Sequence, residues 1–356
     1  MPYSDPRFKV FAHLDRLALW RHGTKAVPVT VEWDLSNRCP LGCAGCPTSH
    51  LRTEGLLATD QPTTGYEDCG DIADPDLVKK GLSDMATAGV NGVVWSGGGE
   101  PLTHPHWHRI LDDTATLGLQ QGMYTSGIGL SGKDAHRLMQ RLAWIVVSLD
   151  APDADTYAAL KQVPPATFTA ACRSIQLLTA TTSSVPVGVS FLLDGHTTPH
   201  VERMLALARR LDAIYVLFRP RILVDARDPA ACLDDRSWVT EVIPLLRRLS
   251  TEHDVEVDVG RFEEYRDWSG RAYPACYGIR LSTVVTPDGR LWMCCQRRGM
   301  TDSLLGNLTH ESFADIWARH PGQWMDFAHC RVMCRLHLMN TTLAQVYTPR
   351  IHEAFL

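Results

Sequence analysis

The sequence predicts an α/β fold built around a parallel sheet, because strand-like and helix-like segments alternate along most of the chain. Six runs are apolar and rich in β-branched or aromatic residues, which is typical of strands buried on both faces. The helix-period segments between them favour parallel strands with right-handed crossovers. A doubly wound sheet and a partial barrel both satisfy this pattern. The six runs are residues 29–36, 92–100, 122–127, 144–150, 185–194 and 213–220.

Helix signals support this reading. The segment 74–89 begins with Asp74 as N-cap and Pro75 at the first helical position, and Gly89 follows as a stop signal. Near the N-terminus, "FKVFAHLDRLALWRH" (8–22) is expected to form one amphipathic helix.

Composition and charge limit the classes of partner. A chain of 356 residues that is 45% hydrophobic can form one large domain and a smaller one. The formal net charge of -5 gives no support to a nucleic-acid or anionic-membrane partner. No apolar stretch approaches ~20 residues, and the N-terminus lacks a secretory signal. We therefore expect a cytoplasmic protein that binds neither nucleic acid nor membrane.

The 11 cysteines fall mainly into two groups. In a reducing compartment, clustered thiols more often bind metal or carry out redox chemistry than form disulfides. Four cysteines belong to neither group, and Cys172, on an expected helix, is best read as a small buried apolar residue. The front group is Cys39, Cys43 and Cys46; the rear group is Cys276, Cys294, Cys330 and Cys334; the others are Cys69, Cys172, Cys232 and Cys295.

Polar residues and glycines follow five of the expected strands. The first strand runs into "NRCPLGCAGCP" (37–47), and the others run into "SGGGEP", "TSG", "SLD" and "FRPR". The carboxyl ends of parallel strands meet at one rim, where such folds place their active sites. Glycines there let a ligand approach the backbone, although they also serve in plain turns. We expect the five ends to form one binding rim.

Three front cysteines are one too few for a structural zinc site, which takes four protein ligands. A 4Fe-4S cluster held by three thiolates keeps one iron open for a small molecule. Zinc bound by the three cysteines, with His50 as a fourth ligand, is the alternative.

The spacing C-x3-C-x2-C, followed by Gly-Gly-Glu-Pro at the second strand end, resembles the radical S-adenosylmethionine (SAM) superfamily over residues 27–223. The resemblance implies a partial (β/α)6 TIM-type barrel and a SAM-binding 4Fe-4S cluster. In that family the reduced cluster cleaves SAM to a 5'-deoxyadenosyl radical. It also implies a flavodoxin or ferredoxin-type electron donor.

Site residues follow from the same resemblance, by motif position. Cys39, Cys43 and Cys46 would ligate the cluster, and Gly98, Gly99 and Glu100 would hold the methionyl amino group. Ser126, Ser148 and Asp150 would bond the ribose or methionyl end, and Arg219 would meet the methionyl carboxylate. Two positions depart from the family: Gly45 replaces the usual aromatic residue before the third cysteine, and Lys161 lies where an Arg-Gly pair is frequent.

The rear cysteines surround an expected hairpin whose turn is formed by Pro287, Asp288 and Gly289. Cys276 precedes the hairpin and Cys294 follows it. Cys330 and Cys334 are expected one helical turn apart. Four thiolates on a hairpin and a helix suit one zinc ion or one iron-sulfur cluster.

The run C-x12-G-x4-C and the segment that follows it resemble the Twitch/SPASM domains attached to radical SAM enzymes. This resemblance implies a second, auxiliary 4Fe-4S cluster. The G-x4-C spacing favours Cys294 over Cys295 as a ligand, which leaves Cys295 as a possible hydrogen donor to a substrate radical.

Together these resemblances imply a barrel followed by a small α+β auxiliary-cluster domain made of a β-hairpin and helices. The expected segments are an N-terminal helical extension (1–26), the barrel (27–223), a linker helix and strand (224–269), the auxiliary-cluster domain (270–345) and a C-terminal tail (346–356).

The substrate expectation depends on the short segment before the first strand. About 28 residues are too few for a separate peptide-recognition domain. This favours a polar small molecule, such as a sugar, aminocyclitol or nucleoside, that is oxidised or epimerised at a carbinol carbon in antibiotic or other natural-product biosynthesis. A maturase of a ribosomally made peptide and a non-catalytic metal-binding protein are the alternatives. The long loop 47–74 could reach the site through Tyr66 or Cys69.

Overall fold

The computed structural model describes residues 6–43, 46, 48, 68–221, 236–253, 255–257, 259–267, 270–327, 330, 334–348 and 351. Its centre is a nine-stranded sheet in the order β6-β5-β4-β3-β2-β1-β7-β8-β9. Strands β1 to β6 are parallel neighbours in chain order, and the sheet is not closed, so the expected partial barrel is confirmed. The six strands are β1 Thr30–Trp33, β2 Gly92–Trp95, β3 Gln120–Thr125, β4 Trp144–Ser148, β5 Val187–Leu193 and β6 Tyr215–Pro220.

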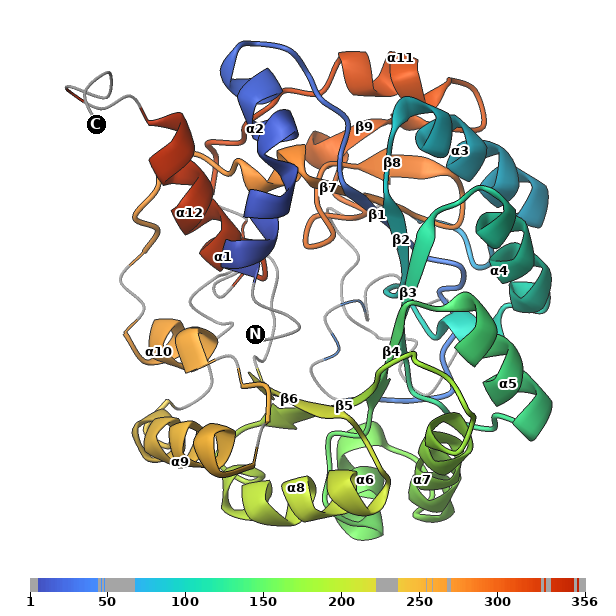
Figure 1. The fold of residues 1–356 in the computed structure, drawn as a ribbon, viewed down its shortest axis with the longest axis vertical. Coiled ribbons are helices and arrows are strands. Elements are labelled where there is room, and N and C mark those ends of the chain that lie inside the picture. The colour runs from blue at the N-terminus through green and yellow to red at the C-terminus, as the bar shows by residue number, and fades with distance from the viewer. Residues whose placement is uncertain are drawn as a thin grey trace.

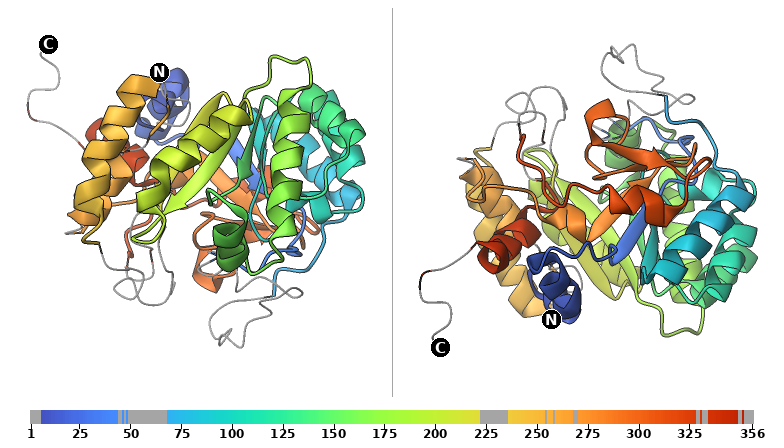
Figure 2. Two further views of the ribbon diagram at one scale, coloured as in Figure 1. Left: turned by 90° about the horizontal axis from the view of Figure 1, so that it is seen from below. Right: turned by 90° about the horizontal axis from the view of Figure 1, so that it is seen from above.

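The connecting helices lie along the outer face of the curved sheet (Figure 1). The N-terminal helices, α10 and α12 lie on the opposite side of the molecule from α3, α4 and α5 in the ribbon views (Figures 1 and 2). The outer helices are α3 Pro75–Ala88, α4 Trp107–Thr116, α5 Gly132–Arg141, α6 Ala154–Lys161, α7 Ala166–Thr179 and α8 Val201–Arg210. The remaining helices are α1 Pro6–Lys9, η1 Val10–His13, α2 Leu14–Arg21, η3 Pro101–Thr103, η4 Thr198–His200, α9 Val239–His253, α10 Val259–Arg266, η5 Gly278–Arg280, η6 Thr301–Ser303, α11 Phe313–Ala318 and α12 His337–Tyr347.

The predicted caps of α3 are confirmed. The Asp74 carboxylate accepts a hydrogen bond from the backbone N–H of Asp76 at 2.8 Å, which satisfies one of the unpaired donors of the first turn. Gly89 ends the helix with φ of 103°, a left-handed conformation that glycine adopts without a Cβ penalty. These caps fix where α3 begins and ends within the crossover from β1 to β2.

The rear of the chain extends the same sheet. β7 (Ser282–Val285) pairs in parallel with β1, and β8 (Arg290–Trp292) and β9 (Leu304–Asn307) follow as antiparallel strands. The predicted hairpin is therefore present, but it belongs to the barrel's sheet. The expectation of a helix carrying both Cys330 and Cys334 is wrong, because neither residue is helical and α12 begins only at His337.

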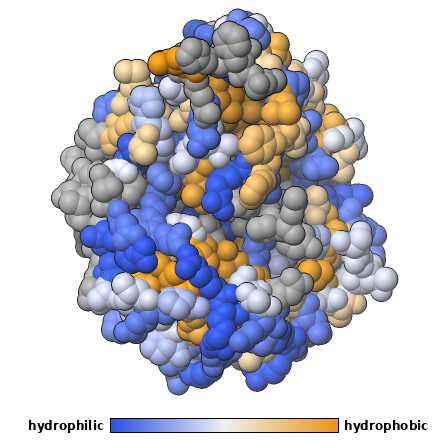
Figure 3. Space-filling model, turned by 60° about the vertical axis from the view of Figure 1, so that its left-hand side comes forward, coloured by the Kyte–Doolittle hydropathy of each residue, from blue (hydrophilic) through white to orange (hydrophobic). Residues whose placement is uncertain are grey.

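The outer surface mixes polar and apolar areas. The N-terminal helices expose Phe8, Phe11 and Leu14, each at least half accessible to solvent. The face in Figure 3, turned to bring that side forward, shows hydrophobic areas interrupted by hydrophilic ones. Within the part of the chain that the structure describes, no helix is long and apolar enough to cross a membrane.

A buried histidine joins the rear region to the N-terminal helices. His320 stacks on Trp317, with ring centroids 4.3 Å apart, and meets the edge of Trp20. Its Nδ1 accepts a hydrogen bond from the N–H of Gly322, which requires the neutral ring. Burial, with Lys25 and Arg280 nearby, lowers the pKa of His320 to about 3.

This histidine predicts an acid-sensitive stability. In the unfolded chain the ring takes up a proton below its ordinary pKa of 6.5, whereas the folded state resists protonation down to about 3. The free energy of unfolding should therefore fall as the pH drops from 6.5 toward 3, by at most about 1.4 kcal/mol per pH unit from this group. Thermal unfolding followed by circular dichroism should show a flatter pH dependence for His320→Gln than for His22→Gln, a change at an exposed histidine. Equal slopes would contradict the assignment.

Candidate functional site

A cavity of about 320 Å³ lies at the carboxyl ends of the parallel strands. It brings together most of the predicted site residues, from the loop after β1 and the ends of β2, β3 and β4. The predicted residues that line it are Cys39, Cys43, Cys46, Gly98, Gly99, Glu100, Ser126, Ser148, Asp150 and Cys295. We call this the front cavity.

Glycines at the end of β2 let the cysteine loop pack against the strand. The N–H of Gly99 donates to the carbonyl of Ser36 at 2.7 Å, and the N–H of Glu100 donates to the carbonyl of Arg38 at 2.8 Å. A Cβ at position 99 would overlap the Arg38 carbonyl oxygen and come within 2.6 Å of its carbonyl carbon. Gly99 is therefore needed for this close approach, and it fixes the position of the loop that carries the three thiols.

Glu100 joins the ends of two strands. One carboxylate oxygen accepts hydrogen bonds from Thr125 Oγ1 at 2.6 Å and from the N–H of Leu102, and the other accepts from the N–H of Ser126 at 2.6 Å. The side chain is buried yet borders the front cavity. A carboxylate has about four acceptor positions. These three bonds orient it and leave room for a cationic donor.

Ser126 presents an unsatisfied polar atom. Its Oγ is buried and has no hydrogen-bond partner within the described structure, although the residue lines the front cavity. Buried hydroxyls are rarely unpaired, because desolvation without a partner costs about 1–3 kcal/mol. This atom fits a polar ligand such as SAM, which would satisfy it.

Asp150 and Lys161 form a buried ion pair beside the cysteine loop. Asp150 has a φ of 61°, which is strained for a residue with a Cβ. Its carboxylate is held by Lys161 Nζ and by the N–H of Leu192 at 3.0 Å. The Lys161 carbonyl accepts from the N–H of Gly42 at 2.8 Å, so the pair also anchors the loop. Lys161 departs from the family pattern, and the sequence assigned it no role.

The rear cysteines line a second, smaller cavity of about 30 Å³. Cys276, Cys294, Cys330 and Cys334 all border it, which groups the four predicted ligands. Among the described residues, no three His, Cys, Asp or Glu side chains are arranged to hold a single metal ion. We call this the rear cavity.

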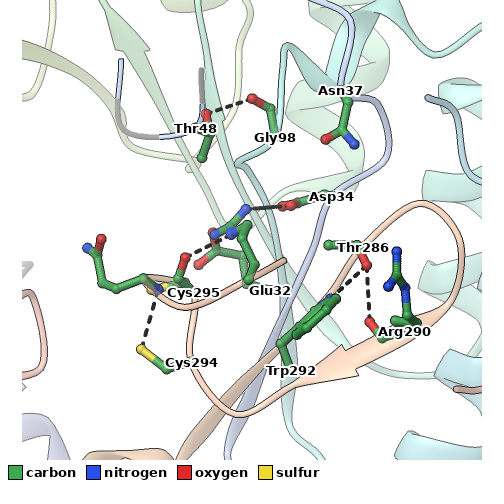
Figure 4. Close-up of polar contacts among 12 residues, drawn as sticks. Glu32, Asp34, Asn37, Thr48, Gly98, Thr286, Arg290, Trp292, Cys294 and Cys295 are labelled. Atoms are coloured by element: carbon green, nitrogen blue, oxygen red, sulfur yellow. Dashed lines mark hydrogen bonds and ion pairs between the residues drawn. The ribbon is translucent and has the colours of Figure 1, made fainter. Parts of the chain in front are cut away.

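Residues 294–298 form the wall between the two cavities. Cys294 lines the rear cavity and Cys295 lines the front one, and Gln296 borders both. Figure 4 shows the two thiols on this short segment beside Glu32 and Asp34. The choice of Cys294 as ligand and the placing of Cys295 near the substrate radical both agree with this geometry and stay predictions. A hydrogen bond with Cys294, then the charges of Arg335 and Arg298, lower the pKa of Cys295 to about 6.

A buried ionic cluster supports this wall, and the sequence analysis missed it. Arg298 binds both Asp34 oxygens, at 2.6 and 2.5 Å, and Glu32 at 2.5 Å, and Arg335 also pairs with Glu32. Burial opposes ionisation of Glu32, but Arg335 and Arg298 outweigh it and lower its pKa to about 2. Burial raises the pKa of Asp34 to about 7 despite Arg298. Two acidic residues, Glu32 and Asp34, inside the expected buried strand 29–36 were the available signal.

Two predicted site residues lie elsewhere. Arg219 is not among the residues that line the front cavity; its guanidinium donates to the carbonyl of Phe218 in β6. Cys69 packs in the core with Val284 and Trp292, and burial raises the pKa of its thiol to about 12. Cys69 is therefore a core residue and does not line the front cavity. Gly45, His50, Tyr66 and Cys232 lie outside the described residues.

Two protein families match the chain in the regions of these cavities. The radical SAM superfamily matches residues 33–208, and the SPASM iron-sulfur cluster-binding domain matches residues 276–336. The first match contains the three front cysteines and the second contains the four rear ones.

The chain is also similar to individual proteins of known name and structure. The chain is 30% identical over 291 residues to a PqqA peptide cyclase of Streptomyces rochei, covering 80% of this chain and 74% of that one. It is 27% identical over 204 residues to the mycofactocin maturase MftC of Mycobacterium ulcerans, covering 57% and 50% of the two chains. Among solved structures, Streptococcus suis SuiB bound to S-adenosylmethionine is similar with a TM-score of 0.64 at 14% identity, over 90% of this chain and 72% of that one.

The packing of Gly99 predicts a selective loss of iron. Gly99→Ala should displace the cysteine loop, because the new Cβ meets backbone that cannot move without breaking the loop's hydrogen bonds. After anaerobic reconstitution, we expect this variant to bind about half the iron of the wild type, with the rear site still filled. Gly132→Ala is the control, since a Cβ there meets nothing within 4 Å. Full iron loading in Gly99→Ala would contradict the proposed role of this contact.

Proposed function

Because the chain belongs to the radical S-adenosylmethionine superfamily and carries a SPASM-type iron-sulfur domain, we propose that it is a maturase that modifies a ribosomally made peptide. The observation that carries the proposal is the 30% identity to a PqqA peptide cyclase over four fifths of the chain. The mycofactocin maturase, also a relative, supports the same class of activity.

This corrects the expectation from the sequence. Oxidation or epimerisation of a sugar, aminocyclitol or nucleoside is overturned by these relatives, which are named as PqqA peptide cyclases and as a mycofactocin maturase. The expectation relied on the few residues before β1. That reasoning was unsound, because the barrel itself or a separate protein can bind a peptide. The reading as a non-catalytic metal-binding protein is also set aside, since the chain is a radical SAM enzyme.

The two cofactor sites follow from the family and the ligand sets. A radical SAM enzyme with this rear domain carries a SAM-binding 4Fe-4S cluster and binds an auxiliary iron-sulfur cluster. Cys39, Cys43 and Cys46 would hold the first, and the four rear cysteines would hold the second. When bound, the first cluster together with SAM would supply the radical chemistry that abstracts a hydrogen atom from the substrate, and the second cluster would be able to accept an electron.

The chain's own residues bind and orient SAM. Glu100 would accept the methionyl ammonium, because its carboxylate is fixed by three hydrogen bonds at the cavity edge. The free Ser126 hydroxyl and Ser148 would bond the ribose or the methionyl end. Asp150 would accept further hydrogen bonds from SAM while its ion pair with Lys161 holds the carboxylate in place.

The position of the rear cavity behind residues 294–298 supports a reaction that joins two carbons of the peptide substrate. Joining two C–H carbons of a peptide removes two hydrogens, hence two electrons and two protons. Abstraction of one hydrogen atom removes one electron and one proton. One further electron and one further proton must therefore leave the substrate. Gln296 borders both cavities, and the rear ligand set therefore lies directly behind the front cavity.

The test uses short peptides encoded by reading frames beside the chain's own gene. Each is incubated anaerobically with the reconstituted enzyme, SAM and dithionite. We expect one peptide to lose two hydrogens, measured by mass spectrometry, together with formation of 5'-deoxyadenosine. The Cys39→Ala, Cys43→Ala, Cys46→Ala variant should give neither product. Hydrogen abstraction from sugars or aminocyclitols, but from none of the peptides, would refute the proposal.

Ser126 gives a separate prediction for SAM binding. Ser126→Ala should weaken equilibrium binding of SAM to the reconstituted enzyme about 2- to 10-fold, the range expected for one neutral hydrogen bond. Equilibrium dialysis measures this directly, and Ser83→Ala, on the outer helix α3, is the control. Unchanged affinity would show that the hydroxyl does not contact SAM.

A further inference from the structure

Every thiol of the rear cavity accepts a hydrogen bond from nitrogen. Two of the donors are backbone groups: the N–H of Gln296 reaches Cys294 Sγ at 3.4 Å, and the N–H of Leu336 reaches Cys334 Sγ at 3.4 Å. The other two are side chains, and these can be changed without altering the backbone. They are Asn340 at Cys276 and Arg297 at Cys330.

The orientation of Asn340 is determined by its neighbours. Its Oδ1 accepts hydrogen bonds from the N–H groups of Tyr277 and Gly278, both at 2.7 Å. The amide nitrogen must therefore face the other way, and it lies 3.2 Å from Cys276 Sγ. The residue is buried, so this donor is shielded from bulk solvent.

Arg297 brings a buried positive charge to the same cavity. Only 3% of the residue is exposed, and its Nη1 lies 4.0 Å from Cys330 Sγ. Its Nε is buried without a partner within the described structure, as is Nε1 of Trp324, over whose ring the guanidinium lies. Both residues line the rear cavity, so both provide unsatisfied N–H donors next to the thiols.

The lining is cationic overall. It includes Arg271 and Arg297 and, among the described residues, no carboxylate side chain. The carboxylate of Asp302 pairs with Arg297 from outside the lining and is 45% exposed, so solvent screens its charge. Buried cations and N–H donors stabilise whichever state of a bound group carries more negative charge.

We propose that Arg297 and Asn340 raise the reduction potential of the auxiliary cluster and so make the rear cavity an electron-accepting site. Uptake of one electron adds one negative charge to a cluster held by four thiolates, and hydrogen bonds to the sulfurs are one of the factors that set such potentials. The proposal rests on the auxiliary-cluster assignment made above. Arg297 and Asn340 are positioning residues, because each acts through a cysteine sulfur.

The experiment measures the midpoint potential of the rear cluster alone. The background is the Cys39→Ala, Cys43→Ala, Cys46→Ala variant, which removes the front ligands. After anaerobic reconstitution, iron and sulfide are counted, and the cluster is titrated with dithionite while its electron paramagnetic resonance signal is followed. Arg297→Gln removes the charge, Arg297→Lys keeps it, and Asn340→Ser removes the donor to Cys276. Arg247→Gln is the control for a charge change at an exposed site.

We expect Arg297→Gln to lower the reduction equilibrium constant about tenfold, or 59 mV for one electron. Arg297→Lys should lie between this variant and the background, Asn340→Ser should also shift downward, and Arg247→Gln should not shift. If Arg297→Gln does not retain iron, the Arg297→Lys and Asn340→Ser shifts decide the question. Unchanged potentials in the variants that hold four irons would overturn the tuning role. An absence of iron in the background protein would overturn the auxiliary-cluster assignment itself.

Discussion

The buried ionic cluster of Glu32, Asp34, Arg298 and Arg335 holds the two halves of the protein in register. The two acids belong to β1 and its extension, whereas the two arginines come from the rear region. Such a cluster adds little net stability compared with apolar packing, but the loss of one member leaves a buried charge unpaired, at about 3–5 kcal/mol. Any movement of residues 294–298 away from β1 meets this penalty. The wall between the cavities is therefore a fixed part of the fold.

Much of the fold was predictable from local patterns. The six parallel strands and the caps of α3 follow from apolar periodicity, Asp74 and Gly89, because these features depend on neighbouring residues alone. The position of β7 beside β1 was not predictable, since strand pairing depends on distant packing. For the same reason the sequence did not predict that the rear hairpin continues the barrel's sheet, and it placed Cys330 and Cys334 on a helix that begins only after them.

The candidate site likewise combines residues that local sequence motifs identified with residues whose partners depend on folding. The strand-end motifs identified most of the residues around the front cavity, because parallel strands bring their carboxyl ends together. Cys69 was included only because it lies in the long loop 47–74, and its burial against Trp292 depends on the folded structure. Lys161 and the two arginines of the ionic cluster were missed because their partners, Asp150, Glu32 and Asp34, are brought near only by folding. The substrate class came from relatives, since no residue pattern in the chain specifies a peptide.

The pairing of β7 with β1 has a consequence for how the enzyme could have been assembled. β1 would otherwise be an open edge of a parallel sheet, with unpaired N–H and C=O groups next to the loop that carries the three front cysteines. The rear region covers that edge with backbone hydrogen bonds, so β7 acts as a seventh parallel strand of the barrel. A recombination event that exchanged this region for another would have to supply a strand of matching register as well as four cysteines. The front and rear ligand sets are thus tied to one continuous sheet.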